Sequence, residues 1–360
     1  MKEEMLVYVG TYTRGRSEGI YVYRLDPSSG ALEFASKATG LNNPSFLAID
    51  PAQRYLYSVN EVSEFAGKPT GAVSAFSIDH KTWELAYLNT ESSLGAGPCY
   101  LTVDQTGRFV LVANYSSGSV CALPIQDDGK LGEATGFVQH HGSSVNPRRQ
   151  KGPHAHSIVL GPANRYAFAA DLGLDKMMIY KFDSARGKLE PNDEPWAKIK
   201  AGAGPRHFAF HPNGSHAYLI NELDNTLIAF AYEKAHGTLR ELQTVPALPE
   251  DFAGRSYCAD VHVHQSGRFV YGSNRGHDSI VIYGIDESTG KLTYVDHEPT
   301  KGKNPRNFAI DPTGTFLLAA NQDSDNIVTF HIDQKTGRLT STGNVAEVPT
   351  PVCLKMIRTS

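Results

Sequence analysis

Acid–base and anion-binding side chains recur at two fixed places in this sequence. The sequence repeats a pattern in which a proline or small residue is followed sixteen residues later by asparagine or aspartate. We call these two residues the first and second anchors of each copy, and each place is the residue directly after an anchor. Ser45, Cys99, His156, Arg206, Ala259 and Arg306 follow the first anchors, and Glu61, Tyr115, Leu172, Glu222, Arg275 and Gln322 follow the second. Imidazole, guanidinium and carboxylate groups can move protons and hold anions. They collect mainly in the later copies, which makes those positions candidates for function.

The constant spacing of the anchors indicates an internal repeat. The first anchors are Pro44, Pro98, Ala155, Pro205, Cys258 and Pro305, and the second are Asn60, Asn114, Asp171, Asn221, Asn274 and Asn321. A further first anchor, Pro351, lies near the end of the sequence, and a strand-like segment that could complete it, Leu6-Val-Tyr-Val-Gly-Thr11, stands at the start. One repeat is therefore divided between the termini.

A second motif counts the copies independently. A polar turn that ends in leucine recurs at Leu32, Leu85, Leu131, Leu189, Leu239, Leu292 and Leu339. Each copy of roughly fifty residues holds four short strand patterns, as propeller blades do, and no segment shows a convincing helical period. We therefore predict an all-β fold: a single seven-bladed β-propeller domain over residues 1–360, with four-stranded antiparallel blades. Pairing of the N- and C-terminal segments is expected to close the ring.

The blade geometry places the candidate groups on one rim. The first strand of a blade runs down beside the channel and the second runs back, so the start of one and the end of the other share an edge. Long insertions at 61–71, 139–152 and 247–257 fall on the same edge. Insertions concentrated on one face are typical of the binding face of a repeat protein.

Composition excludes several classes of partner. The net charge of −4 leaves no global basic field for nucleic acid, and no apolar run approaches the length of a membrane span. The four cysteines are scattered and form no CxxC pair, so we interpret them as buried free thiols in a reducing compartment. The N-terminus shows no signal-peptide core. We expect a cytoplasmic protein without nucleic-acid or membrane partners; its oligomeric state leaves no signal in the sequence.

Five short motifs resemble the seven-bladed propeller lactonases. They are Tyr8-Val-Gly-Thr-Tyr-Thr13, Gly152-Pro-His-Ala-His-Ser157, Gly204-Pro-Arg-His207, Asn221-Glu222-Leu223 and Ser273-Asn-Arg275. That family includes the bacterial propeller-type 6-phosphogluconolactonase and the fungal carboxy-muconate cyclase. The resemblance covers essentially the whole chain. It implies a catalytic set of one histidine, two arginines and one glutamate at the channel mouth, which falls on His154, Arg206, Glu222 and Arg275.

The chemistry of these groups suits the opening of a lactone. The reaction needs an activated water, a group that holds the developing oxyanion and a proton for the leaving alkoxide. We expect Glu222 to act as general base and His154 as general acid, while Arg206 and Arg275 hold phosphate and oxyanion in an order that stays open. Two structural alternatives stand beside these roles. Glu222 could simply lock Arg206 in a salt bridge, and His154 could simply bond a loop carbonyl.

Further residues are predicted to line the substrate site. They are His156, His207, His262, Asn274, Gln322 and Arg148. Structural roles compete for several: His156 and His262 could be satisfied internal histidines, Asn274 could tie down a turn, and Arg148 could be ordinary solvated charge. Two His-x-His pairs suggest a metal, but neither has a carboxylate third ligand at fixed spacing. We predict neither metal nor cofactor.

The most specific hypothesis is a hydrolase that converts 6-phosphogluconolactone to 6-phosphogluconate in the oxidative pentose phosphate pathway, with a small anionic sugar lactone as its partner. A lyase that closes a carboxylated muconate to its lactone is the first alternative, because the same arginines would grip carboxylates. The second is a catalytically silent propeller that binds protein or glycan. Such a platform would carry an exposed apolar patch on the rim instead of a polar pocket.

Overall fold

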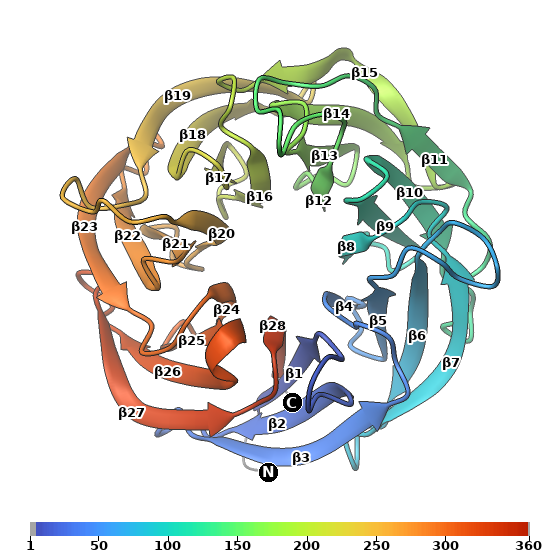
Figure 1. The fold of residues 1–360 in the computed structure, drawn as a ribbon, viewed down its shortest axis with the longest axis horizontal. Helices are drawn as coiled ribbons and strands as arrows, with labels where there is room; N and C mark the ends of the chain where they lie inside the picture. The colour runs from blue at the N-terminus through green and yellow to red at the C-terminus, as the bar shows by residue number, and fades with distance from the viewer. Residues whose placement is uncertain (1–4, 359–360) are drawn as a thin grey trace.

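Seven four-stranded sheets are arranged as the blades of a closed ring (Figure 1). The computed structural model describes residues 5–358, and the predicted all-β seven-bladed propeller is confirmed within that range. In each blade, neighbouring strands are antiparallel and follow one another from the central channel outward, as β16 to β19 do.

Each blade has its innermost strand first in the following order. The blade that contains both chain ends has β28 (Pro351–Arg358), β1 (Met5–Thr11), β2 (Gly19–Leu25) and β3 (Leu32–Thr39). The next has β4 (Leu47–Ile49), β5 (Tyr55–Asn60), β6 (Ala72–Ile78) and β7 (Leu85–Ser92). The third has β8 (Pro98–Val103), β9 (Phe109–Asn114), β10 (Ser119–Pro124) and β11 (Gly136–Gln139).

The remaining four blades follow the same order. They comprise β12 (Ala155–Leu160), β13 (Tyr166–Asp171), β14 (Lys176–Asp183) and β15 (Lys188–Lys198); β16 (Pro205–Phe210), β17 (His216–Asn221), β18 (Thr226–Glu233) and β19 (Thr238–Pro246); β20 (Tyr257–Val263), β21 (Phe269–Arg275), β22 (Ser279–Ile285) and β23 (Leu292–Pro299); and β24 (Pro305–Ile310), β25 (Phe316–Asn321), β26 (Asn326–Ile332) and β27 (Leu339–Glu347). A short 3-10 turn, η1 (Gln322–Ser324), follows β25.

The ring closes where the two chain ends pair, as predicted. β1 lies antiparallel to β28, with Met5 opposite Arg358 and Val9 opposite Leu354. On its other side β1 pairs with β2. The C-terminal segment therefore supplies the innermost strand of the blade that the N-terminal segment begins, and backbone hydrogen bonds hold the ring together.

The hydrophobic core lies between neighbouring blades. Phe168 of β13 and Phe208 of β16 stack with ring centroids 5.8 Å apart, within a cluster that joins two blades. Middle strands such as β17 are buried on both faces, whereas the outermost strand β19 is largely accessible. This is why the inner strands are continuous apolar runs and the outer strands are mixed. Within residues 5–358, no helix has the length and apolar character needed to cross a membrane.

A β-bulge interrupts the innermost strand of several blades directly after the first anchor. In β16, Pro205 and His207 pair with β17 while Arg206 is left out of the ladder. The same shift in β8, β12 and β24 leaves out Cys99, His156 and Arg306. A bulge bends its strand and re-aims the extra side chain. Each bulge therefore turns one side chain out of the regular alternation of its strand.

Candidate active site

A cavity of about 200 Å³ lies at one end of the central channel. Its lining residues are Glu61, Cys99, Tyr115, Arg149, His156, Glu222, Arg275 and Arg306. All of these except Arg149 occupy a position directly after an anchor. Arg149 comes from the 139–152 insertion, which reaches over the cavity from the connection between β11 and β12.

Glu222 lies at the centre of a group of cations. Its Oε2 accepts a hydrogen bond from Arg206 Nε at 3.1 Å and lies 2.9 Å from Arg275 Nη2. Its Oε1 accepts from Arg149 Nη2, and His156 Nε2 lies 3.7 Å from Oε2. Both carboxylate oxygens are therefore engaged by permanent cations. We call these five side chains the Glu222 cluster.

The pKa values in the cluster follow from burial and from these charges. Burial alone would raise the pKa of Glu222, but Arg275 and Arg206 outweigh it and hold that pKa well below its usual value. Burial, reinforced by Arg206, keeps the pKa of His156 well below its usual value, so its imidazole is neutral at neutral pH. Burial also lowers the pKa of Arg206 to about 9, which leaves the guanidinium charged.

Glu61 and Arg306 form another part of the cavity lining, and Tyr12 contacts both of them; we call these three residues the Arg306 wall. Tyr12 O–H donates to both carboxylate oxygens of Glu61, at 3.0 and 3.2 Å, and Ser45 Oγ donates to the same carboxylate. The guanidinium carbon of Arg306 lies 5.5 Å from the centre of the Tyr12 ring. Here the carboxylate is bonded by hydroxyl groups, and the guanidinium lies against an aromatic ring.

A buried polar network continues from Glu222 to a second carboxylate, Asp260. His207 Nδ1–H donates to Asp260 at 2.7 Å, and Arg206 Nη1 donates to His207 Nε2 at 3.2 Å. Burial lowers the pKa of His207 to about 3, and the neutral ring fits this donor–acceptor arrangement. Asp260 also accepts from His262 and Asn307. We call Asp260 with these three partners the Asp260 network.

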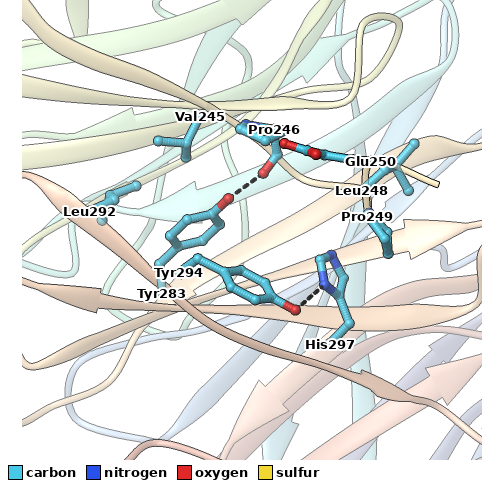
Figure 2. A pocket seen from close by; sticks show the side chains of 9 residues that line it. All are labelled: Val245, Pro246, Leu248, Pro249, Glu250, Tyr283, Leu292, Tyr294 and His297. Carbon is cyan, nitrogen blue, oxygen red and sulfur yellow. Dashed lines mark hydrogen bonds between the residues drawn. The ribbon is translucent and has the colours of Figure 1, made fainter. Parts of the chain in front are cut away.

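Figure 2 shows a larger cavity, of about 470 Å³, between the outer parts of two blades. The Tyr294 hydroxyl is bonded to His297 Nδ1, and the Tyr283 hydroxyl to the Pro246 carbonyl. The walls are otherwise mainly apolar, with Glu250 at one edge. Because its hydroxyl groups are bonded within the wall, this cavity lacks the converging free polar groups of a catalytic site. The 247–257 insertion contributes to it through Leu248, Pro249 and Glu250.

Comparison with known proteins agrees with this architecture. Residues 6–356 match the family described as "Lactonase, 7-bladed beta-propeller". The chain belongs to this family. It is 42% identical over 350 residues to 6-phosphogluconolactonase of Bacillus subtilis, with 97% of each protein covered. It is 38% identical over 312 residues to 6-phosphogluconolactonase of Formosa agariphila, with 85% of this chain and 86% of that protein covered.

One solved structure superimposes on almost the whole chain. The periplasmic gluconolactonase of Pseudomonas aeruginosa is 36% identical, with a TM-score of 0.92 and coverage of 98% of this chain and 99% of that one. The expected resemblance to the propeller lactonases, and with it a carboxylic-ester hydrolase of the lactonase type, is thereby confirmed.

In the present chain, the structure brings three of the four predicted catalytic residues together. Arg206, Glu222 and Arg275 share one cluster, although they come from two blades and from positions far apart in the sequence. Arg206 is only 1% exposed and does not line the cavity, so it supports Glu222 from below. Arg275 and Glu222 reach the cavity surface. The three roles assigned from the sequence therefore stay predictions, with Arg206 in a supporting position.

His154 lies beside the cavity instead of lining it. Its Nδ1–H donates to the Tyr115 carbonyl at 2.9 Å, and its ring stacks on the Tyr115 ring with centroids 4.6 Å apart. This is the loop-carbonyl alternative considered for His154. The neighbour two residues on, His156, occupies the bulge in β12 and faces Glu222. The sequence motif contains both histidines, and the bulge decides which one reaches the carboxylate.

The other predicted binding residues are dispersed. His207 is buried between Arg206 and Asp260, and His262 bonds Asp260 and lines a separate cavity of about 260 Å³ with Ile310 and Met356. Asn274 Nδ2 donates to Ser279 Oγ of its own blade and to the Ala247 carbonyl in the connection from the preceding blade, and Gln322 Nε2 donates to Asp323. Arg148 is exposed to solvent. Of these predicted residues, His156 alone lines the 200 Å³ cavity.

Five cavity residues were not predicted as site residues: Glu61, Cys99, Tyr115, Arg149 and Arg306. Four of them occupy anchor-following positions, so the repeat carried a signal that could have identified them. Arg149 lies in an insertion without a repeat equivalent, where no such signal exists. Within residues 5–358, no three His, Cys, Asp or Glu side chains are grouped as a metal site requires.

Proposed function

We propose that this lactonase hydrolyses 6-phosphogluconolactone to 6-phosphogluconate, as a step of the oxidative pentose phosphate pathway. The observation that carries the proposal is the charge of the cavity. Three guanidinium groups line it and a fourth, that of Arg206, lies directly beneath, against only two carboxylates, Glu61 and Glu222. A phosphate monoester brings between one and two negative charges at neutral pH, which matches this excess.

The groups at the cavity surface suit attack of water on a lactone carbonyl. Arg275 and Arg149 direct N–H groups toward the same carboxylate at the cavity surface, where they can also hold an oxyanion. Glu222 is ionised, and its oxygens are engaged by three guanidinium groups. In this proposal Glu222 fixes the arginines and stabilises a protonated His156, and the neutral imidazole of His156 takes the proton from water. The same imidazolium then protonates the leaving ring oxygen.

The test is a hydrolysis assay on the phosphorylated lactone and on unphosphorylated gluconolactone. Acid release at constant pH is recorded, and the spontaneous rate is subtracted. We expect kcat/KM for the phosphorylated substrate to exceed that for the neutral one by about 10- to 100-fold, the value of one or two charge-assisted hydrogen bonds. Release at the spontaneous rate with both lactones would overturn the proposal. Turnover of a carboxylated muconate in their place would favour the cyclase.

A further inference from the structure

Arg306 differs from every other arginine of the site in its partners. Arg149, Arg206 and Arg275 each bond Glu222. Arg306 lines the same cavity, yet among residues 5–358 it has no hydrogen bond or ion pair. A guanidinium carries five N–H donors, and such donors inside a protein are normally satisfied. The donors of Arg306 are therefore available to a molecule in the cavity.

The neighbours of Arg306 hold it in place without satisfying it. Its guanidinium lies over the Tyr12 ring, and the Tyr12 hydroxyl is fixed by two contacts to Glu61. Ser45 Oγ bonds the same carboxylate, so the oxygens of Glu61 are already occupied by hydroxyl donors. Glu61 supplies a nearby negative charge that favours the guanidinium, but no bonded partner. The wall thus presents a guanidinium whose donors have no hydrogen-bond partner among residues 5–358.

The Arg306 wall and the Glu222 cluster come from different parts of the ring. Arg306 lies in β24, and Tyr12 and Glu61 directly follow β1 and β5. His156 lies in β12, and Arg206 and Glu222 belong to the blade of β16. In Figure 1 these two groups of strands stand on opposite sides of the channel. A substrate in the cavity can therefore place one end at the Arg306 wall and the other at the Glu222 cluster.

We infer that Arg306 is the anchor of the substrate's phosphate group and thereby determines the preference for phosphorylated over neutral lactones. A planar guanidinium binds two oxygens of a phosphate in parallel, and the Tyr12 ring keeps its plane oriented. The carbonyl of the lactone then lies toward Arg275, Arg149 and His156. The inference deepens the proposed function and rests on it for the identity of the substrate, but the anion site itself is independent of turnover.

The experiment uses Arg306→Gln and Arg306→Lys in the full chain, with Arg186→Gln as the matched loss of charge. Arg186 is a fitting control because its side chain is 80% exposed on the turn between β14 and β15. Each variant is assayed on both lactones, and binding of inorganic phosphate is measured by calorimetry. Melting temperatures of all four proteins are compared, so that unfolded variants are recognised.

For Arg306→Gln we expect kcat/KM on the phosphorylated lactone to fall by about 10- to 100-fold, mainly through KM, because one charge-assisted contact pair is lost. The value for the neutral lactone should change by less than about threefold, since that substrate makes no contact of this kind. Phosphate binding should weaken in parallel. Arg306→Lys should lie between Arg306→Gln and wild type, because it keeps the charge but not the fork.

Two results would overturn the inference. One is an equal loss on both lactones in a folded Arg306→Gln protein, which would indicate a structural role. The other is unchanged phosphate affinity in that variant. Failure of the proposed function would give a different result, because the wild-type protein would then turn over neither lactone. In that case the calorimetric comparison of wild type, Arg306→Gln and Arg186→Gln still decides whether Arg306 forms the anion site.

Discussion

Glu222 and Asp260 are both buried carboxylates of this propeller, with 4% and 3% of their surface exposed. Their partners differ. Glu222 is held by three permanent cations and borders a cavity, whereas Asp260 accepts hydrogen bonds from two histidines, an asparagine and a backbone N–H. Burial would raise the pKa of each, and the partners hold both pKa values well below the usual range.

The difference separates a carboxylate that organises a site from one that organises the scaffold. Asp260 in β20 joins His207 of β16 to Asn307 of β24, and Asn307 Oδ1 accepts from the backbone of Leu354 in β28. The Asp260 network thus ties together the innermost strands of four blades. Glu222 instead orients Arg149 and Arg275, two guanidinium groups that line the cavity. We therefore expect removal of the Glu222 charge to reduce activity and removal of the Asp260 charge to reduce stability.

Glu222→Gln should give the largest loss of activity. The amide keeps the shape of the side chain but removes the charge that orients Arg149 and Arg275, and its NH₂ group is a donor facing donors. We expect kcat/KM to fall by about 100- to 1,000-fold, the range for a lost oxyanion-stabilising group. Steady-state kinetics on the phosphorylated lactone, corrected for the folded fraction, measures it. Unchanged kinetics would mean that Glu222 has no part in turnover.

Asp260→Asn is the matched change in the scaffold. We expect the free energy of unfolding in urea to fall by about 1–3 kcal/mol, because one of the converging donors loses its acceptor. The kcat/KM of the folded protein should stay within about tenfold of wild type, since Asp260 acts on the cavity only through His207 and Arg206. A loss of activity as large as that of Glu222→Gln would abolish the distinction between the two carboxylates.

Acid should destabilise the protein through the histidine between the two carboxylates. The pKa of His207 is lowered by burial to about 3, against about 6.5 in an unfolded chain. The unfolded state alone binds a proton between these values, so this contribution is complete above about pH 6.5 and is lost as the pH falls toward 3. We expect this histidine to remove about 1.4 kcal/mol of unfolding free energy per pH unit in that window.

Urea unfolding of wild type and His207→Asn between about pH 7 and 4.5 checks the acid effect. The variant starts from lower stability, but its stability should decline less steeply, since one proton-linked group is gone. Equal slopes for the two proteins would show that His207 does not contribute to the pH dependence.

Two adjacent arginines of the 139–152 insertion give the smallest predicted effect. Arg149 lines the cavity and donates to Glu222 and Tyr115, whereas Arg148 is exposed. We expect Arg149→Gln to raise KM about tenfold and Arg148→Gln to change it by less than about twofold. Kinetics of both variants at two salt concentrations measures this. An equal rise for Arg148→Gln would support its predicted binding role through long-range attraction of the anion.

Much of the site was predictable because a residue's place in the repeat indicates its place in the blade. Equivalent residues of each copy must occupy equivalent places in a ring, so residues that follow the anchors were expected at one rim, and the cavity contains Glu61, Glu222, Arg275 and Arg306 there. Contacts across the ring were not predictable in this way. The Glu222 partners come from separate blades and an insertion, and their meeting depends on how the ring closes.

The sequence by itself determined the number of blades, the division of one blade between the chain ends and the rim on which the chemistry collects, because each follows from local periodicity. The anchor spacing put His156 at the rim, but tertiary structure alone decided that it faces Glu222 while His154 bonds the Tyr115 carbonyl. It alone decided that Arg149 joins the cluster while Arg306 keeps its donors free. Those outcomes depend on distances between residues far apart in the chain, and no spacing along the chain encodes them.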